Sequence, residues 1–145
     1  MLNNTVYTGT GKNWIGTCKS GFSTDYFTLG QDGTPIVFYA TKIANGLTTS
    51  GSPQPRGYNI ITSTASTFQN MYRNGILFQA ATGALPGTIF TSVVIGALNN
   101  SGSIAQYYDN TYAFTTIGRG LGAAEVSTLS TIINTFQTTL GRNTY

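Results

Sequence analysis

Short runs of β-branched and aromatic residues alternate with glycine-, asparagine- and proline-containing turn signals along most of the chain. Runs punctuated in this way are typical of β-strands in a sandwich or barrel. The turn signals lie at 9–11, 31–33, 44–46, 50–57, 73–75, 85–87 and 99–102. The runs between them predict strands at Asp25–Leu29, Pro35–Ile43, Tyr58–Thr64, Thr67–Arg73, Ile76–Ala81, Ile89–Leu98 and Tyr107–Ile117.

The pair Asn74-Gly75 is the clearest local signal, because both central positions of a type I′ hairpin turn need a positive φ. A two-residue loop there sets opposite residues as Arg73 with Ile76, Tyr72 with Leu77 and Met71 with Phe78. Residues opposite one another share a face. Apolar side chains then occupy both faces, with Phe68, Tyr72 and Leu77 on one and Met71, Ile76 and Phe78 on the other. This pattern predicts a hairpin inside a layered structure, with neither face fully in water.

The last part of the chain changes to a helical period. Its apolar positions are spaced by three and four residues, at Val126, Leu129, Ile133, Phe136 and Leu140. Glu125 falls in the first turn, where the helix dipole favours an acid, and Gly141 suits the left-handed position after the last turn. We expect this stripe to dock on the sheet. A short seam between chains is the alternative.

Composition places the chain among ordered domains with little surface charge. Of its 145 residues, 40% are hydrophobic, 12% aromatic and only 8% charged. Aromatic and β-branched residues exclude a disordered chain. The length suits a single domain with its own core, spanning residues 1–145. Cys18 is the only cysteine, so no intrachain disulfide can form, and we interpret it as a buried, inert thiol.

The distribution of charge and the absence of long apolar runs argue against nucleic acid binding and membrane insertion. The seven Lys and Arg residues outnumber the four acids but are scattered, with no two adjacent, so nucleic acid is not an expected partner. No apolar run approaches the length of a membrane span, and membrane insertion is not expected. The start, MLNNTVYTG, lacks the basic and apolar regions of a secretory signal peptide. If the protein works outside a cell, we expect it to travel there on a particle or by lysis, or this chain to be a fragment of a longer secreted protein.

The residues needed for hydrolytic chemistry are scarce. The chain has no histidine, and its acids are Asp25, Asp32, Asp109 and Glu125. A glycoside hydrolase needs two carboxylates flanking the scissile bond, and no such pair is clustered in the sequence. We therefore expect no enzymatic activity and no catalytic residues. No cofactor or metal is expected either. Asp109 is a weak candidate ligand for Ca²⁺, since such a site usually gathers several oxygen atoms.

Binding of a glycan or a neighbouring protein needs fewer special groups. Aromatic rings stack on sugar rings, although most aromatic residues pack in cores. The segment QYYDNTY and the nearby NNSG loop supply the candidate contact residues, which are Tyr107, Tyr108, Asp109, Tyr112, Asn99 and Asn100. Adjacent residues on a strand face opposite ways, so at least one of Tyr107 and Tyr108 is expected to be exposed. Packing against another chain and sugar binding are both open for the exposed ring.

Four motifs carry a family resemblance. They are YRNG at Tyr72–Gly75, IGALNNSG at Ile95–Gly102, AFTTIGRGL at Ala113–Leu121 and AAEVSTLSTIINTFQTTLGR at Ala123–Arg142. In this order they resemble concanavalin A-like, laminin-G-like jelly-roll modules found at the C-terminus of phage fibre or tail chains and bacterial surface proteins. Residues 1–56 match less clearly, and we expect their strands to be abbreviated or completed by another chain.

The resemblance implies an all-β jelly-roll sandwich with one C-terminal helix packed on it. It also implies a non-enzymatic virion or cell-surface module, such as a fibre, tail or capsid-decoration protein. Its expected partners are other virion or surface proteins and a host glycan. The alternative is a carbohydrate-binding module of a secreted polysaccharide-degrading enzyme. Low charge leaves little repulsion between copies, so we expect a homo-oligomer or a multi-copy protein.

Overall fold

The computed structural model describes residues 12–18, 26–32, 37–40, 47–49, 57–83, 92–108 and 115–142. Within these ranges the chain is mostly β, with two sheets and one helix near its C-terminus. The smaller sheet has the order β5-β6-β7, built from β5 (Asn59–Ala65), β6 (Phe68–Arg73) and β7 (Ile76–Thr82). The helix, α1, is Ala123–Thr139. The expected β-rich chain with a final helix is confirmed.

The larger sheet gathers strands from both ends of the sequence, in the order β10-β9-β1-β2-β3-β4, with β8 also pairing with β1. β10 is the strand at one edge of this sheet, near β8 and β9, and β4 is the strand at the other edge. The strands are β1 (Lys12–Cys18), β2 (Tyr26–Asp32), β3 (Val37–Ala40), β4 (Leu47–Thr49), β8 (Val94–Ile95), β9 (Leu98–Asn100) and β10 (Ser103–Ala105).

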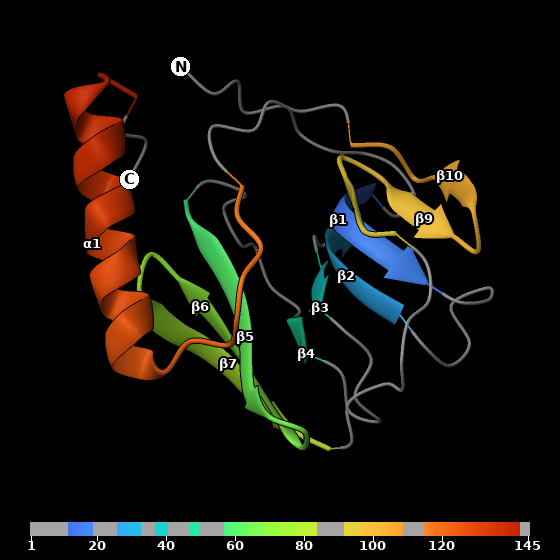
Figure 1. The fold of residues 1–145 in the computed structure, drawn as a ribbon, viewed down its shortest axis with the longest axis horizontal. Helices are drawn as coiled ribbons and strands as arrows, with labels where there is room; N and C mark the ends of the chain where they lie inside the picture. Colours follow the sequence, from blue (N-terminus) through green and yellow to red (C-terminus); the bar gives the residue numbers. More distant parts are fainter. Residues whose placement is uncertain are drawn as a thin grey trace.

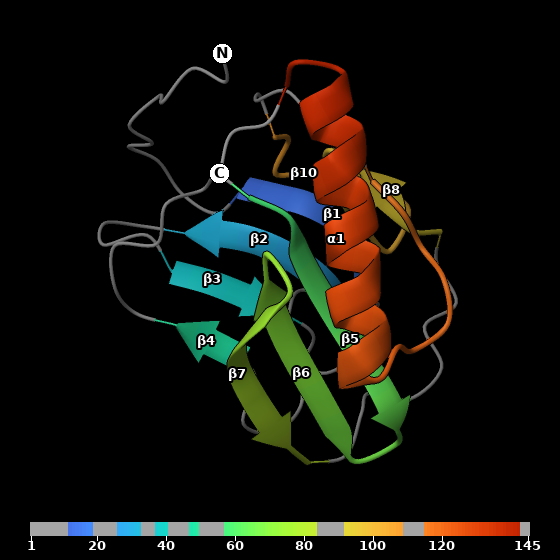
Figure 2. The ribbon, with the colours of Figure 1, turned by 90° about the vertical axis from the view of Figure 1, so that its left-hand side faces the viewer.

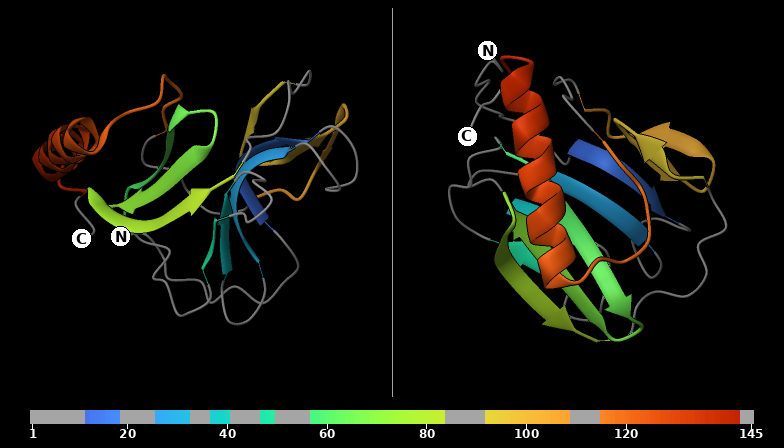
Figure 3. Two further views of the ribbon diagram at one scale, coloured as in Figure 1. Left: turned by 90° about the horizontal axis from the view of Figure 1, so that it is seen from below. Right: turned by 60° about the vertical axis from the view of Figure 1, so that its left-hand side comes forward.

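The elements are stacked in layers. Figure 1 shows α1 lying along the smaller sheet, with the larger sheet on the other side of the molecule. In Figure 2 the helix stands in front of β5, with β6 and β7 beside it. Figure 3, seen from below, shows the smaller sheet between α1 and the larger sheet. The smaller sheet is therefore covered on one face by α1 and faces the larger sheet with the other.

Strand β6 is buried on both faces, as a middle layer requires. On the helix side, Tyr72 packs with Ile60 and Val126. Met71, the next residue back along the strand, points to the other face and is 1% exposed. The expectation that neither face of this hairpin is fully in water is confirmed for β6. Strand β7, at the sheet edge, is more exposed, with Ile76, Leu77 and Phe78 all open to solvent.

The hairpin register is confirmed at the turn and wrong beyond it. Arg73 pairs with Ile76 and Tyr72 with Leu77, but Met71 pairs with Gln79. A bulge after Leu77 leaves Phe78 as an extra residue on β7. Phe78 therefore does not lie opposite Met71, which corrects the predicted pairing.

Helix α1 is docked on the smaller sheet, but its buried stripe differs from the apolar one. Its buried residues are Val126, Ser130, Ile133 and Gln137. Leu129 is half-buried at the edge of this face, whereas Phe136 and Leu140 are exposed. The prediction that all five apolar positions face the sheet is thus wrong for Phe136 and Leu140. The helix is rotated so that two polar side chains replace them in the interface.

The segment before α1 is fixed tightly to β5. The Leu121 N–H donates to Thr62 Oγ1 at 2.6 Å, and the same hydroxyl donates to the Leu121 carbonyl at 2.9 Å. Gly120 lies so close to β5 that a Cβ there would be 1.8 Å from the Ser63 carbonyl oxygen. Only glycine fits this crossing, so residues 120–121 set where the helix begins relative to the sheet.

Other strand limits differ from the sequence prediction. β1, β4 and β10 lie where no strand was expected, and β2 continues to Asp32, into the turn expected at 31–33. The structure describes the expected strand Ile89–Leu98 only from residue 92 onward. In this part the chain forms two short strands, β8 and β9, which are separated at Gly96, whose φ is 84°. Residues 107–108 and 115–117 are not in a strand, which corrects the described part of the expected strand Tyr107–Ile117.

Candidate functional site

Four exposed apolar side chains come from β8, β10 and the residues beside these strands. We call this set the β8–β10 patch: Val93, Ile95, Ile104 and Tyr107. Tyr107 is the most open of them, at 61% exposed, and its hydroxyl donates to the Ile104 carbonyl at 3.2 Å. The expectation that one of the adjacent tyrosines is exposed is confirmed for Tyr107. Its ring is held against β10 rather than projecting freely.

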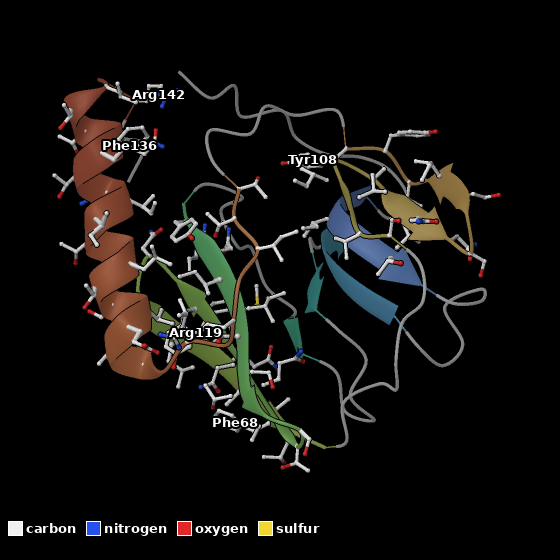
Figure 4. All side chains as sticks on the ribbon, in the orientation of Figure 1. Phe68, Tyr108, Arg119, Phe136 and Arg142 are labelled. Carbon is white, nitrogen blue, oxygen red and sulfur yellow. The ribbon has the colours of Figure 1, made fainter. Side chains whose placement is uncertain are left out.

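The remaining candidate residues at this end have mixed positions. Tyr108 is half-buried, and its backbone N–H donates to the Gly96 carbonyl at 2.7 Å. Figure 4 shows Tyr108 at the upper end of the larger sheet, away from α1. Asn100 is half-buried. Asp109 and Tyr112 lie outside the described residues, so the Ca²⁺ candidate and part of the expected contact stay predictions.

Asn99 supports the loop from the inside. It is 6% exposed, its Nδ2 donates to the Ser92 carbonyl, and its Oδ1 accepts from the Gly102 N–H, both at 2.8 Å. The turn it braces has two residues with positive φ, Ser101 at 51° and Gly102 at 99°. Asn99 therefore helps to hold the β9–β10 turn, which lies just before Ile104 and Tyr107 in the chain.

Arg119 and Glu125 form an ion pair at the start of α1 (Figure 4 labels Arg119). Glu125 lies in the first turn of the helix, and the Gly122 N–H donates to its Oε2 at 2.9 Å. The hydrogen bonds from Arg119 and Gly122 lower the pKa of Glu125 to about 2. Within the described ranges, no group of three or more His, Cys, Asp and Glu residues is placed to hold a metal ion.

A second candidate site lies between the tip of the β6–β7 hairpin and α1. This helix–hairpin groove is a hollow of about 220 Å³. Its lining is polar and uncharged apart from one apolar side chain, Ile76, at its lip. The lining residues are Asn74, Gly75, Ile76, Ser127, Ser130, Thr131 and Asn134. Sequence reasoning missed this groove, because Ser130 and Asn134 sit on what reads as the polar face of the helix.

The turn geometry places the hairpin tip against the helix. Asn74 and Gly75 have φ values of 50° and 81°, as the type I′ turn requires. Asn74 also ties the turn to the start of β5, since its Oδ1 accepts from the Tyr58 N–H at 2.8 Å. A Cβ on Gly75 would lie 3.1 Å from Ser130 Cβ. The absent side chain therefore lets the turn approach α1.

Among the described residues, no helix is both long and apolar enough to cross a membrane. Comparison of the chain with models of protein families, with curated proteins and with solved structures gave no match in any of the three.

Proposed function

We propose that this chain is a non-enzymatic structural and binding module of a virion or cell surface, of the fibre, tail or capsid-decoration kind. In this proposal its two sheets are those of a concanavalin A-like, laminin-G-like jelly roll, and its partner is a host glycan or a neighbouring virion protein. The layered sheets and the helix docked after the last strands support that fold. The resemblance of the motifs in residues 57–142 supports the assignment to surface proteins.

The observation that carries the proposal is the β8–β10 patch. An exposed tyrosine with a hydrogen-bonded hydroxyl offers a rigid, amphipathic contact surface, which suits both sugar rings and protein partners. Tyr107 has this form, and Ile104 beside it is 41% exposed. Exposed apolar groups that lie together, as Tyr107 and Ile104 do, commonly mark an interaction site. The chain has no histidine and four acids, a composition that favours binding over hydrolysis.

The test is the variant Tyr107→Ala in the full chain, assayed on a glycan array and on particles or surfaces of the producing organism. We expect binding about tenfold or more weaker, as for an exposed aromatic contact at an interface centre. The melting temperature should change little, because the side chain is 61% exposed.

Two controls separate binding from folding. Ile117→Ala removes another side chain, 65% exposed, from outside the patch and should change neither binding nor stability. Tyr72→Ala, in the core at 4% exposed, should lower the melting temperature strongly. Equal binding by the parent chain and Tyr107→Ala would refute the patch as the contact. Turnover of a polysaccharide by the parent chain would refute the non-enzymatic function.

A further inference from the structure

Buried hydroxyl and amide groups on α1 lack hydrogen-bond partners. Ser130 is 6% exposed, and its Oγ has no partner in the structure; the same holds for the buried Oδ1 of Asn134. Both residues line the helix–hairpin groove. A buried polar atom without a partner is uncommon in native proteins and calls for a missing partner such as water or a ligand.

The Ser130 hydroxyl differs from the threonine hydroxyls of this helix. Five threonine hydroxyls each donate to the carbonyl four residues earlier, at 2.8–3.1 Å, namely those of Thr128, Thr131, Thr135, Thr138 and Thr139. Ser130 makes no such bond, although it occupies the same helix. Its hydroxyl turns about a single χ1 bond. It can therefore meet a group entering the groove without movement of α1.

The lining restricts the chemistry of that group. Among the described residues, none that lines the groove is charged, so these residues offer neither the cationic donors that an anion needs nor the carboxylates that a metal cation needs. Ser130 can donate or accept, and Asn134 Oδ1 accepts. A hydroxyl group satisfies both, since it donates and accepts at once. Exposed Ile76 at the lip adds an apolar contact for a carbon face.

The size of the groove points to one small ring. Its volume of about 220 Å³ lies below the roughly 300–1,000 Å³ of pockets for drug-sized ligands. It is also well above the roughly 30 Å³ that one water molecule occupies in the liquid. We propose that the helix–hairpin groove is a second binding site, which takes a single neutral sugar ring through Ser130 and Asn134. This site is separate from the β8–β10 patch, so either one can fail without the other.

Amide-resolved NMR of the full chain tests the proposal. The probes are methyl α-mannopyranoside, methyl β-galactopyranoside and methyl N-acetyl-β-glucosaminide, with mannose 6-phosphate as the charged comparison. We expect at least one neutral probe to give saturable shifts centred on Gly75, Ser130 and Asn134, and the charged probe to bind more weakly. Ser130→Ala should weaken that binding about tenfold, as expected for loss of a buried hydrogen bond.

Ser130→Ala should at the same time keep or raise the melting temperature of the free protein, because it removes a buried hydroxyl without a partner. Thr135→Ala is the matched control: it removes an exposed helical hydroxyl that does not line the groove, and should leave the affinity unchanged. Asn134→Ala serves as a second variant and should also weaken binding. Absence of saturable shifts, shifts confined to other residues, or equal affinity in Ser130→Ala would each overturn the proposal.

Discussion

At the scale of single residues, Gly120 shows how a missing side chain fixes the architecture. Its backbone crosses β5 so closely that only glycine fits against the Ser63 carbonyl. Beside it, Thr62 and Leu121 exchange two hydrogen bonds that anchor the start of the helix. Gly118, two residues earlier, has no neighbour within 4 Å of an added Cβ among the residues that the structure describes. These two glycines therefore have opposite sensitivities to substitution.

Gly120→Ala should lower the free energy of unfolding by about 1–3 kcal/mol or more, the usual range for overpacking. The new methyl group would meet a backbone oxygen, which cannot rotate away. Gly118→Ala should be neutral or slightly stabilising. Urea unfolding of both variants measures the difference, and equal stabilities would show that residue 120 does not touch β5.

Glu125 gives a pH-dependent contribution at the same junction. Arg119 and the Gly122 N–H hold the pKa of Glu125 at about 2, below its ordinary value of about 4.5. A depressed carboxyl pKa adds stability above the unfolded-state pKa, and this stability is lost as the pH falls from about 4.5 toward 2. The pair is exposed and screened by solvent, so the contribution is small.

We expect the melting temperature of Glu125→Gln to fall less steeply than that of the parent chain between pH 4.5 and pH 2. NMR titration of the Glu125 carboxyl group measures the pKa directly. A midpoint at the ordinary value of a free glutamate would contradict the pairing with Arg119.

At the scale of elements, the helix shows what a sequence pattern can and cannot tell. The three-and-four spacing predicted α1 and its docking, because Val126 and Ile133 are apolar and buried. The spacing could not predict the rotation of the helix about its axis that buries Ser130 and Gln137, because the pattern assigns polar residues to the exposed face. The groove follows from that rotation, so it was beyond reach from the sequence.

In the strands, too, the sequence predicted one feature, the hairpin turn, and missed another, the bulge. Asn74-Gly75 fixed the hairpin turn, since few other residue pairs accept two positive φ values. The bulge at Phe78 left no signal, because apolar residues occupy both faces of the hairpin and every register looks acceptable. The exposed Tyr107 lies within the contact segment that the sequence predicted. The supporting role of Asn99 could not be predicted, because it depends on hydrogen bonds to Ser92 and Gly102 that exist only in the folded loop.

Adjacent isoleucines on α1 test the orientation of the helix. Ile133 is 6% exposed and Ile132 is 57% exposed. Ile133→Ala should cost about 2–5 kcal/mol of unfolding free energy through loss of burial and a cavity. Ile132→Ala should change it by about 0.5 kcal/mol or less. Chemical denaturation measures the unfolding free energy of both variants. A larger loss for Ile132→Ala than for Ile133→Ala would show that α1 docks through its other side.

At the scale of the whole molecule, the layers separate two surfaces. Tyr107 and its neighbours lie on the larger sheet, and the helix–hairpin groove lies on the far side of the smaller one. A surface protein present in many copies can use one face for its assembly and another for a ligand. Low charge, with four acids in 145 residues, leaves little repulsion between such copies.

The most direct test of the proposed function is cryo-electron microscopy of particles or surface assemblies purified from the organism that encodes the chain. We predict that the chain occupies many symmetry-related positions, with the β8–β10 patch against a neighbouring protein or turned outward toward a host glycan. The map of a Tyr107→Ala assembly should show reduced occupancy or lost attachment. A chain absent from every such assembly, and monomeric in solution by sedimentation, would contradict the proposed function.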